Sequence, residues 1–313
     1  MQTGSSGIFL VFTMRLRTGR GRLLAGFGLG FGLASILTLT APSAHAVILG
    51  GVDGTANTTA PADDPGWDRV GLVNGSSAVY LGNDFVLSAK HVDAGNLLLN
   101  GTSYTLDPTY TPQYLETAPG QFADLVIFRV INGPTMNFMP IYSGSGEAGS
   151  TATLIGIGAD RGTEVPNQGW LWDTNHTMRW GQNIVDGSAT VNQGSFFYQA
   201  LVTDFDRVGL GGSGLANEAT GAFGDSGGGL FIKQGGVWKL AGIMAGVTQD
   251  GRSFYDNNTS LPGDQPDQMG SVRLSAYSNW ILSTIPEPST VASGAIGLAG
   301  LVVAILRRRR CAS

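Results

Sequence analysis

Cysteine is almost missing from this chain of 313 residues, and the single one, Cys311, is third from the C-terminus. A central region without cysteine cannot form disulfide bonds, so its stability has to come from a packed core, which this length can supply. Histidine is also scarce, because His45, His91 and His176 are the only ones. That leaves few candidates for a catalytic base.

Basic residues are few in the centre of the chain. Of eighteen Lys and Arg, eight lie in the two ends, whereas only Glu287 of the twenty-three Asp and Glu does, so residues 47–285 carry a formal charge near −12. Domains that bind nucleic acids present clustered positive charge to the phosphates. The sequence therefore predicts no nucleic-acid partner.

The apolar run near the N-terminus looks like a targeting segment. Four arginines within residues 15–22 precede the apolar, Gly-rich stretch 23–39, and Ala44-His45-Ala46 forms a small-residue cleavage site. This order predicts a secretory signal peptide over residues 1–46, removed by signal peptidase, with Met14 as an alternative start. A membrane anchor is the alternative, which the cleavage site disfavours.

A second apolar run ends the chain. The sequence Pro286-Glu287-Pro288 is followed by the uncharged stretch 291–306 and then by four arginines at 307–310. Sixteen residues are marginal for crossing ~30 Å of hydrocarbon, and the arginines should stay on the cytoplasmic side. Residues 286–313 resemble the PEP-CTERM sorting signal of Gram-negative, exopolysaccharide-making bacteria. The resemblance implies transient membrane contact through 291–306 and processing by an exosortase-like enzyme. It also implies export to the cell envelope, outer surface or medium; a simple tail anchor is the alternative.

Short apolar runs separated by Gly, Asn, Asp and Pro fill the centre of the chain and indicate an all-β fold. We expect two antiparallel barrels, over about 47–142 and 143–285, with a cleft between them and a helix at 274–283. The expected strands are 70–73, 78–81, 85–89, 97–99, 125–130, 139–142, 151–157, 185–191, 200–205, 230–233 and 237–247. Stretch 161–172 looks like a loop whose two tryptophans either pack against the barrel or form a binding rim. Stretch 250–268 looks like a solvated acidic insertion; calcium binding is the alternative, but the spacing of a calcium-binding loop is absent.

The stretch from Gly224 to Leu230, with the sequence GDSGGGL, is the strongest functional signal. Its glycines let backbone N–H groups turn towards one point, where an oxyanion would lie if Ser226 attacked a carbonyl. A plain glycine-rich hairpin loop would need neither Asp225 nor Ser226. We interpret Ser226 as a nucleophile.

A serine needs a base, and His91 is the best candidate. It ends an apolar, strand-like run, whereas His176 lies in a polar, loop-like run and is the weaker choice. Asp124 begins the apolar sequence Asp-Leu-Val-Ile-Phe, and a buried acid there needs a hydrogen-bonding reason, such as orienting the imidazole. The alternatives are that Asp124 caps a turn, or that Asp93, which looks like a turn residue, takes this role.

The order of the three residues separates rival hydrolases. The α/β-hydrolases require a histidine after the serine, and no histidine follows Ser226. A subtilisin order needs an acid before His91, and Asp68 and Asp84 lie outside apolar strands. The chain therefore favours the order His, Asp, Ser.

These segments together resemble the chymotrypsin-like (trypsin-fold) serine proteases, over about 48–285. The resemblance implies a secreted endopeptidase that cleaves protein or peptide substrates through an acyl-enzyme, with catalytic residues His91, Asp124 and Ser226. It also implies an oxyanion hole formed by the N–H groups of Gly224 and Ser226, and neither cofactor nor metal. The runner-up is a non-catalytic secreted binding or scaffold protein that keeps the fold.

The chain departs from this family at several positions. Gly229 replaces a proline, Lys90 a small residue, and Ala245 a serine whose hydroxyl would reach Asp124. In the family a freed N-terminus pairs with the acid before the serine, here Asp225. Ile48-Leu49-Gly50-Gly51 resembles that terminus, but cleavage after Ala46 leaves it one residue too long. Either cleavage falls after Val47, or further trimming activates the protein, or Asp225 is ordered otherwise.

The resemblance also suggests which residues bind the side chain before the scissile bond (P1). They are Thr220, six before the nucleophile, together with Ala245 and Val247 on the late strand. None carries a charge, so nothing would offset the desolvation of a cationic side chain. Small or medium uncharged residues are expected there. Glu218 would restore a basic preference if the loop were longer.

Overall fold

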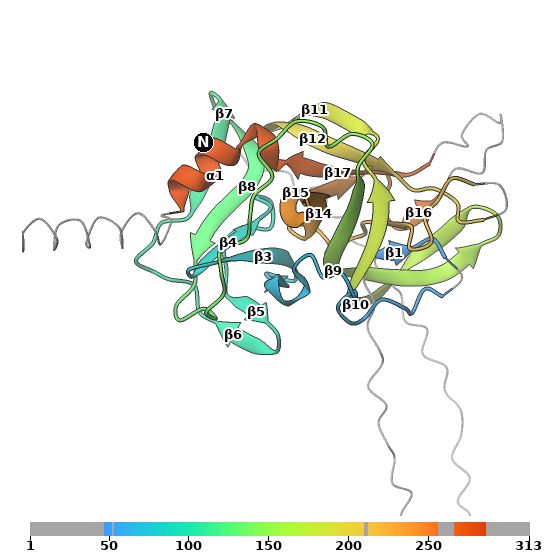
Figure 1. The fold of residues 1–313 in the computed structure, drawn as a ribbon, viewed down its shortest axis with the longest axis horizontal. Helices are drawn as coiled ribbons and strands as arrows, with labels where there is room; N and C mark the ends of the chain where they lie inside the picture. The colour runs from blue at the N-terminus through green and yellow to red at the C-terminus, as the bar shows by residue number, and fades with distance from the viewer. Residues whose placement is uncertain (1–46, 52, 210–211, 256–265, 286–313) are drawn as a thin grey trace, which may run out of the picture. The chain divides into compact units, whose positions relative to one another are not determined.

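The computed structural model describes residues 47–51, 53–209, 212–255 and 266–285 (Figure 1). The predicted signal peptide, 1–46, and the predicted sorting signal, 286–313, lie outside the described residues and stay predictions. Among the helices of the described part, none is long and apolar enough to cross a membrane.

The N-terminal half of the domain is a set of short strands. They pair in the order β8-β4-β3-β2-β5-β6, and β7 pairs with the other edge of β8. The bounds are β1 Ile48–Leu49, β2 Val70–Val73, β3 Ser76–Gly82, β4 Phe85–Ser88, β5 Leu97–Leu99, β6 Thr102–Tyr104, β7 Gln113–Ala118 and β8 Gln121–Arg129, with a 3₁₀ turn at Trp67–Arg69.

The C-terminal half pairs in the order β16-β10-β9-β14-β15-β17-β12, with β11 on β12 and a separate β1–β13 pair. The two halves meet where β12 lies parallel to β8, at Phe196 and Phe122. The bounds are β9 Thr151–Val165, β10 Gly169–Ile184, β11 Gly187–Gln193, β12 Phe196–Asp204, β13 Ala219–Thr220, β14 Gly229–Gln234, β15 Val237–Val247, β16 Arg252–Phe254 and β17 Gln268–Arg273; η2 Leu274–Ala276 and α1 Ser278–Thr284 follow. The predicted fold class is confirmed: two antiparallel β-barrels and a C-terminal helix.

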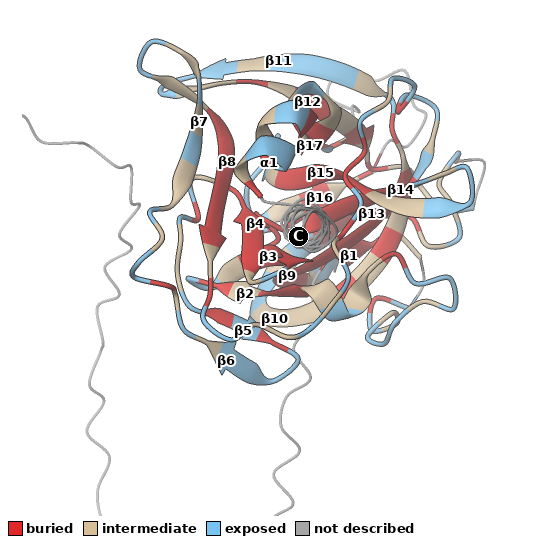
Figure 2. Ribbon diagram, turned by 60° about the vertical axis from the view of Figure 1, so that its left-hand side comes forward, coloured by how far each residue is buried: buried red, intermediate tan, exposed pale blue. Residues whose placement is uncertain are grey.

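The core explains why the central strands read as continuous apolar runs. Every residue from Ala123 to Phe128 on β8 is buried, as are all four residues of β4 (Figure 2). A strand covered on both faces loses the alternation of a half-exposed strand. Asp124 is thereby held inside the protein, which rules out the alternative in which it caps a surface turn.

Two expectations about the connecting segments were wrong. Stretch 139–142 forms no strand; Ile141 makes only an isolated bridge to Leu240. Stretch 161–172 is not a loop, because most of it belongs to the long antiparallel β9–β10 hairpin, which also contains His176. The hairpin is interrupted by register shifts around Trp172, so its apolar pattern is broken and reads as loop.

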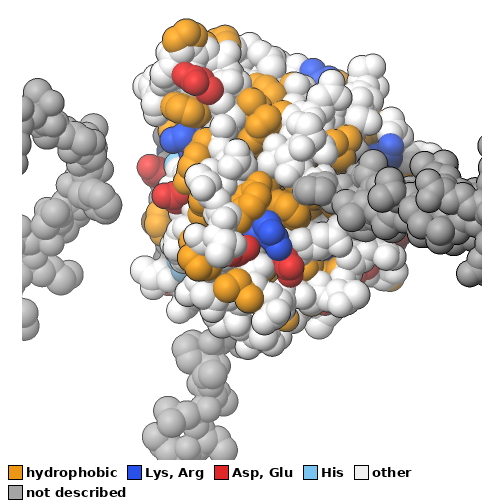
Figure 3. Space-filling view, turned by 90° about the vertical axis from the view of Figure 1, so that its left-hand side faces the viewer, with side chains coloured by type: hydrophobic (Ala, Val, Ile, Leu, Met, Phe, Trp, Pro, Cys, Tyr) orange, Lys and Arg blue, Asp and Glu red, His pale blue; other side chains and the backbone are white. Residues whose placement is uncertain are grey.

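The predicted insertion at 250–268 is partly regular. Strand β16 pairs with β10 at Gly169, Trp170 and Leu171, and Gln268 opens β17, while 256–265 lie outside the described residues. The predicted helix at 274–283 is a 3₁₀ turn followed by α1. On the face that carries α1, hydrophobic side chains are interspersed with uncharged groups and with charged ones of both signs (Figure 3).

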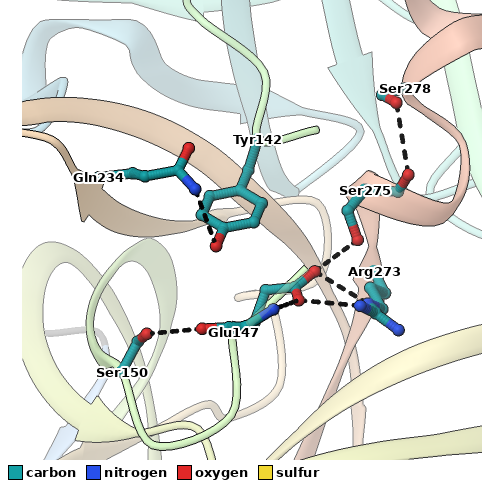
Figure 4. A network of polar contacts seen from close by, with 8 residues as sticks. Tyr142, Glu147, Ser150, Gln234, Arg273, Ser275 and Ser278 are labelled. Carbon is teal, nitrogen blue, oxygen red and sulfur yellow. Dashed lines mark hydrogen bonds and ion pairs between the residues drawn. The ribbon is translucent and has the colours of Figure 1, made fainter. Parts of the chain in front are cut away.

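A buried ion pair fastens the segment between the two halves. Arg273, at the end of β17, makes two hydrogen bonds of 2.8 Å to the carboxylate of Glu147, which also accepts the hydroxyl of Ser275 (Figure 4). Burial alone would raise the pKa of Glu147, but the bonds from Arg273 and Ser275 hold it below its ordinary value. The carboxylate therefore contributes stability only while it is ionised.

Replacing Arg273 by methionine is expected to lower the free energy of unfolding by about 2–3 kcal/mol, because it leaves the buried charge of Glu147 without its partner. The loss is smaller than the about 3–5 kcal/mol of a fully buried pair, since the Arg273 side chain is 26% exposed. The matched control is Lys233→Met, which breaks the exposed Lys233–Asp63 pair and should cost less than about 1 kcal/mol. Since the folded pKa of Glu147 is lowered, its contribution is present near neutral pH and lost as the pH falls below about 4.5. Urea unfolding at pH 7 and pH 3.5 measures both effects; an equal loss in the two variants would contradict the assignment.

Candidate active site

His91 lies just after β4, in a turn closed by hydrogen bonds from the N–H groups of Val92 and Asp93 to Ala89 O. Pairing of Ser88 with Val126 places Asp124, two residues earlier on β8, beside this turn. His91 Nδ1 lies 2.7 Å from Asp124 Oδ2, and the backbone N–H of His91 donates to Oδ1 at 2.9 Å. The Asp124 side chain is 3% exposed and that of His91 37%. A buried carboxylate is thus in direct contact with a half-exposed imidazole, and these are the two residues that the sequence analysis pairs.

Ser226 and His91 line the same cavity. This cavity has a volume of about 240 Å³. Within the described residues the Ser226 hydroxyl makes no hydrogen bond to His91, and such bonds are often long in sites without substrate. The structure therefore brings together the three residues predicted for catalysis, two of them in direct contact.

The backbone around Ser226 leaves two N–H groups available. Three neighbouring N–H groups are already used: that of Asp225 donates to the carbonyl of Ala222, that of Gly227 to Met244, and that of Gly228 to Asp225. Those of Gly224 and Ser226 donate to no acceptor in the described part of the chain. These are the two N–H groups predicted for the oxyanion hole.

Backbone contacts from both halves fix this loop. Gly224 has a φ of 92°, which favours glycine, and its carbonyl accepts the N–H and the hydroxyl of Ser77 at 3.0 and 3.1 Å. A Cβ on Gly227 would lie 1.9 Å from Ser77 O and 2.3 Å from Ser88 Oγ. Ser77 was missed by the sequence reasoning, because a lone serine in an apolar strand carries no signal.

The cavity is lined by Ala245 and Val247, as predicted, but not by Thr220 or Glu218. Thr220 is buried on β13, paired with Ile48, and Glu218 accepts the N–H groups of Asp206 and Leu215. Trp172 also lines the cavity, in keeping with the alternative of a binding rim, as does Asp225, which was predicted for another role. The remaining lining residues were not predicted: Gly221, Ala222, Phe223, Met244, Gly246, Asp250 and Met269. Methionines at this position carry no sequence signal, since they read as core.

Asp225 is almost fully buried, 1% exposed, and no cation among the described residues lies beside it. Burial raises its pKa to about 7, opposed by the N–H groups of Ala222, Val47 and Gly158. The backbone N–H of Ala222 donates a hydrogen bond to Asp225 Oδ2 at 2.8 Å, whereas Oδ1 accepts none that meets the usual geometry among the described residues. One of these backbone N–H groups belongs to Val47, the residue directly after the predicted cleavage site at Ala46.

A second buried carboxylate lies close by. Asp160 on β9 is 2% exposed, and neither of its oxygens has a hydrogen-bond partner among the described residues. Burial, with repulsion from Asp173 and Asp225, raises its pKa to about 8. An unpaired carboxylate is costly in this environment, which favours the protonated form of Asp160.

Lys90, which departs from the family pattern, has a local explanation. Its ammonium lies 4.8 Å from the ring centroid of Phe122 and within 6 Å of those of Tyr114 and Phe196. Cations bind favourably to aromatic faces. The three rings thus surround the charge that replaces the small residue of the family pattern.

No family model matches this sequence, and no curated protein matches it either. Solved structures that are similar include the Rv3671c protease of M. tuberculosis in an inactive form, at 12% identity over 71% of this chain and 90% of that one, with a TM-score of 0.42. The NS6 protease of murine norovirus 1 follows at 15% identity over 69% and 93%, TM-score 0.40. The HtrA-type protease AlgW is 17% identical over 66% of this chain and 50% of its own, TM-score 0.41. At such TM-scores the chemistry has to be judged from this chain's own side chains.

Proposed function

We propose that the protein is a serine endopeptidase that works through an acyl-enzyme. The observation that carries this proposal is the contact of buried Asp124 with His91, in a cavity shared with Ser226. A buried acid held 2.7 Å from a half-exposed imidazole is the arrangement that fixes a general base. Labelling of Ser226 by a fluorophosphonate tests it.

In the proposed reaction, Ser226 Oγ attacks the carbonyl carbon of the substrate while His91 takes the hydroxyl proton. Asp124, bonded to Nδ1, keeps the imidazole in the required tautomer and stabilises its cation. The negative oxygen of the tetrahedral intermediate accepts hydrogen bonds from the free N–H groups of Gly224 and Ser226. His91 then returns the proton to the leaving amine, and water hydrolyses the acyl-enzyme by the same steps.

We also propose that the mature chain starts at Val47. Cleavage after Ala46 would convert the Val47 amide beside Asp225 into an α-ammonium, which supplies the cation that this buried carboxylate lacks. The cleavage by signal peptidase that removes the signal peptide would then also complete the enzyme, without further trimming. The exported product, the transient membrane contact of 291–306 and an exosortase-like processing step are proposals that rest on the sequence alone.

The cavity beside Ser226 is expected to accept small or medium uncharged P1 side chains. Met244, Met269 and Val247 make its wall apolar. Of its two acids, Asp250 is exposed, and Asp225 is buried with backbone N–H groups around its carboxylate. We expect kcat/KM for Ala- or Val-ending chromogenic peptides to exceed that for Arg-ending ones by about 10-fold or more. Val247→Gly should shift the preference towards Phe, whereas Val237→Gly, at the exposed start of the same strand, should not. A preference for Arg would contradict this assignment of the P1 pocket, but it would not contradict the assignment of the catalytic residues.

A further inference from the structure

His176 lies next to the oxyanion loop, although it does not line the catalytic cavity. It sits on β10 directly opposite Ala159 on β9. A Cβ built on Gly224 would lie 2.7 Å from both Nδ1 and Cε1 of the imidazole. The ring therefore packs on the bare backbone of Gly224, whose N–H is one of the two available to an oxyanion.

The β9–β10 hairpin, which carries His176, also fixes the orientation of the peptide bond between Phe223 and Gly224. Ala159 N–H donates to Phe223 O at 2.6 Å. In a trans peptide the carbonyl and the following N–H point in opposite directions, so this bond turns the Gly224 N–H away from β9. If the peptide flipped, it would lose this bond and remove a donor from the oxyanion hole.

The same imidazole also supports the cavity wall. It meets the ring of Phe223 edge-on, at a centroid distance of 5.9 Å and an interplanar angle of 82°. Phe223 is 67% exposed and lines the cavity, so few other contacts hold its ring. Edge-to-face pairs of this kind are favourable. His176 thus contacts both residues of the peptide that has to keep its orientation.

We propose that His176 is a positioning residue for the oxyanion hole, acting by the packing of its ring against Gly224 and Phe223 and not as a base. This role rests on the serine chemistry proposed above. The donor must already be in place when charge develops on the substrate oxygen, and small misplacements of catalytic groups are costly. The ring is expected to affect the chemical step more than substrate binding.

The test compares His176→Ala, His176→Phe and the control Thr174→Ala, an exposed residue of the same hairpin, with wild type. His176→Ala should lower kcat by about 10- to 100-fold with KM within twofold, and weaken a peptide aldehyde inhibitor to a similar extent. His176→Phe should recover most of both, with an unchanged pH profile, because it keeps a flat ring. Thr174→Ala should resemble wild type.

Retention of at least half of kcat in His176→Ala would overturn the proposal. So would a His176→Phe variant that is as impaired as His176→Ala, because that result would indicate a chemical role for the imidazole. Hydrogen exchange of the backbone over 222–226 separates failure here from failure of the proposed function. Exchange should be about 10-fold faster in His176→Ala than in wild type, whether or not the protein turns over peptides. Unchanged exchange contradicts the positioning role, while absent fluorophosphonate labelling of wild type contradicts the serine chemistry alone.

Discussion

Replacing Ser226 by alanine is expected to abolish labelling by a fluorophosphonate and to lower kcat on peptides by about 10⁴- to 10⁶-fold. The nucleophile forms the covalent intermediate, so no other side chain in the cavity can replace it. Ser143→Ala, an exposed serine outside the cavity, is the matched control and should label like wild type. Equal labelling of wild type and Ser226→Ala would contradict the assignment.

His91→Ala should lower kcat nearly as far as Ser226→Ala, because the serine hydroxyl is unreactive without a base. Asp124→Asn should cost about 10⁴-fold, since an amide can hold the imidazole in the wrong tautomer. The double variant Ser226→Ala/His91→Ala is expected to be no slower than Ser226→Ala, because residues that act as a unit are not additive. Additive losses would mean that His91 works independently of Ser226. A folded, correctly processed protein without any Ser226-dependent cleavage would instead favour a non-catalytic binding protein.

Protein that begins at Val47 is expected to be about 100-fold or more faster than protein that keeps Ala46 and residues before it. The physical reason is the ion pair between the new α-ammonium and Asp225: a buried pair that lacks one partner costs about 3–5 kcal/mol, and tenfold corresponds to about 1.4 kcal/mol. Asp225 precedes Ser226 directly, so disorder at the carboxylate reaches the oxyanion hole. Active-site titration of the two purified forms measures the effect.

Asp225→Asn provides the control for this ion pair. In the form that starts at Val47 the substitution should cost as much as the N-terminal extension does, whereas in the extended form it should change little, because the cation is already absent. Equal losses in both forms would show that Asp225 acts without the terminus. The intact mass of the secreted protein provides an independent check, since it should begin at Val47 and lack the arginines at 307–310.

The extended form should also differ in its pH dependence. With only amide partners, burial raises the folded pKa of Asp225 to about 7, above its unfolded value near 3.8. The folded state then holds the proton more tightly, so stability declines as the pH rises from about 4 to about 7. A terminal ammonium lowers this pKa and should reduce the decline. Asp160 and Glu218, both with pKa values raised by burial to about 8, contribute the same sign in either form.

The sequence by itself identified the candidate residues of the site. Ser226 could be found because the glycines around it fall where Gly224 and Gly227 require positive φ, and Asp124 because an acid inside an apolar strand needs a partner. Strand β15 was predicted with its observed bounds, since its apolar run is bounded by a clear glycine turn at 235–236. These signals are local: each is carried by neighbouring residues in the chain.

Only the tertiary structure decided what depends on contacts between distant segments. Register shifts in the β9–β10 hairpin break the alternation of apolar and polar residues, so the sequence predicted a loop at His176. In the structure, pairing with Ala159 places the imidazole against Gly224. Thr220 was assigned to the pocket by counting from the serine, but pairing with Ile48 buries it elsewhere. The place of Val47 beside Asp225 likewise depends on β1 pairing with β13. Spacing along a chain fixes which residues are near in sequence, whereas strand register decides which side chains share a cavity.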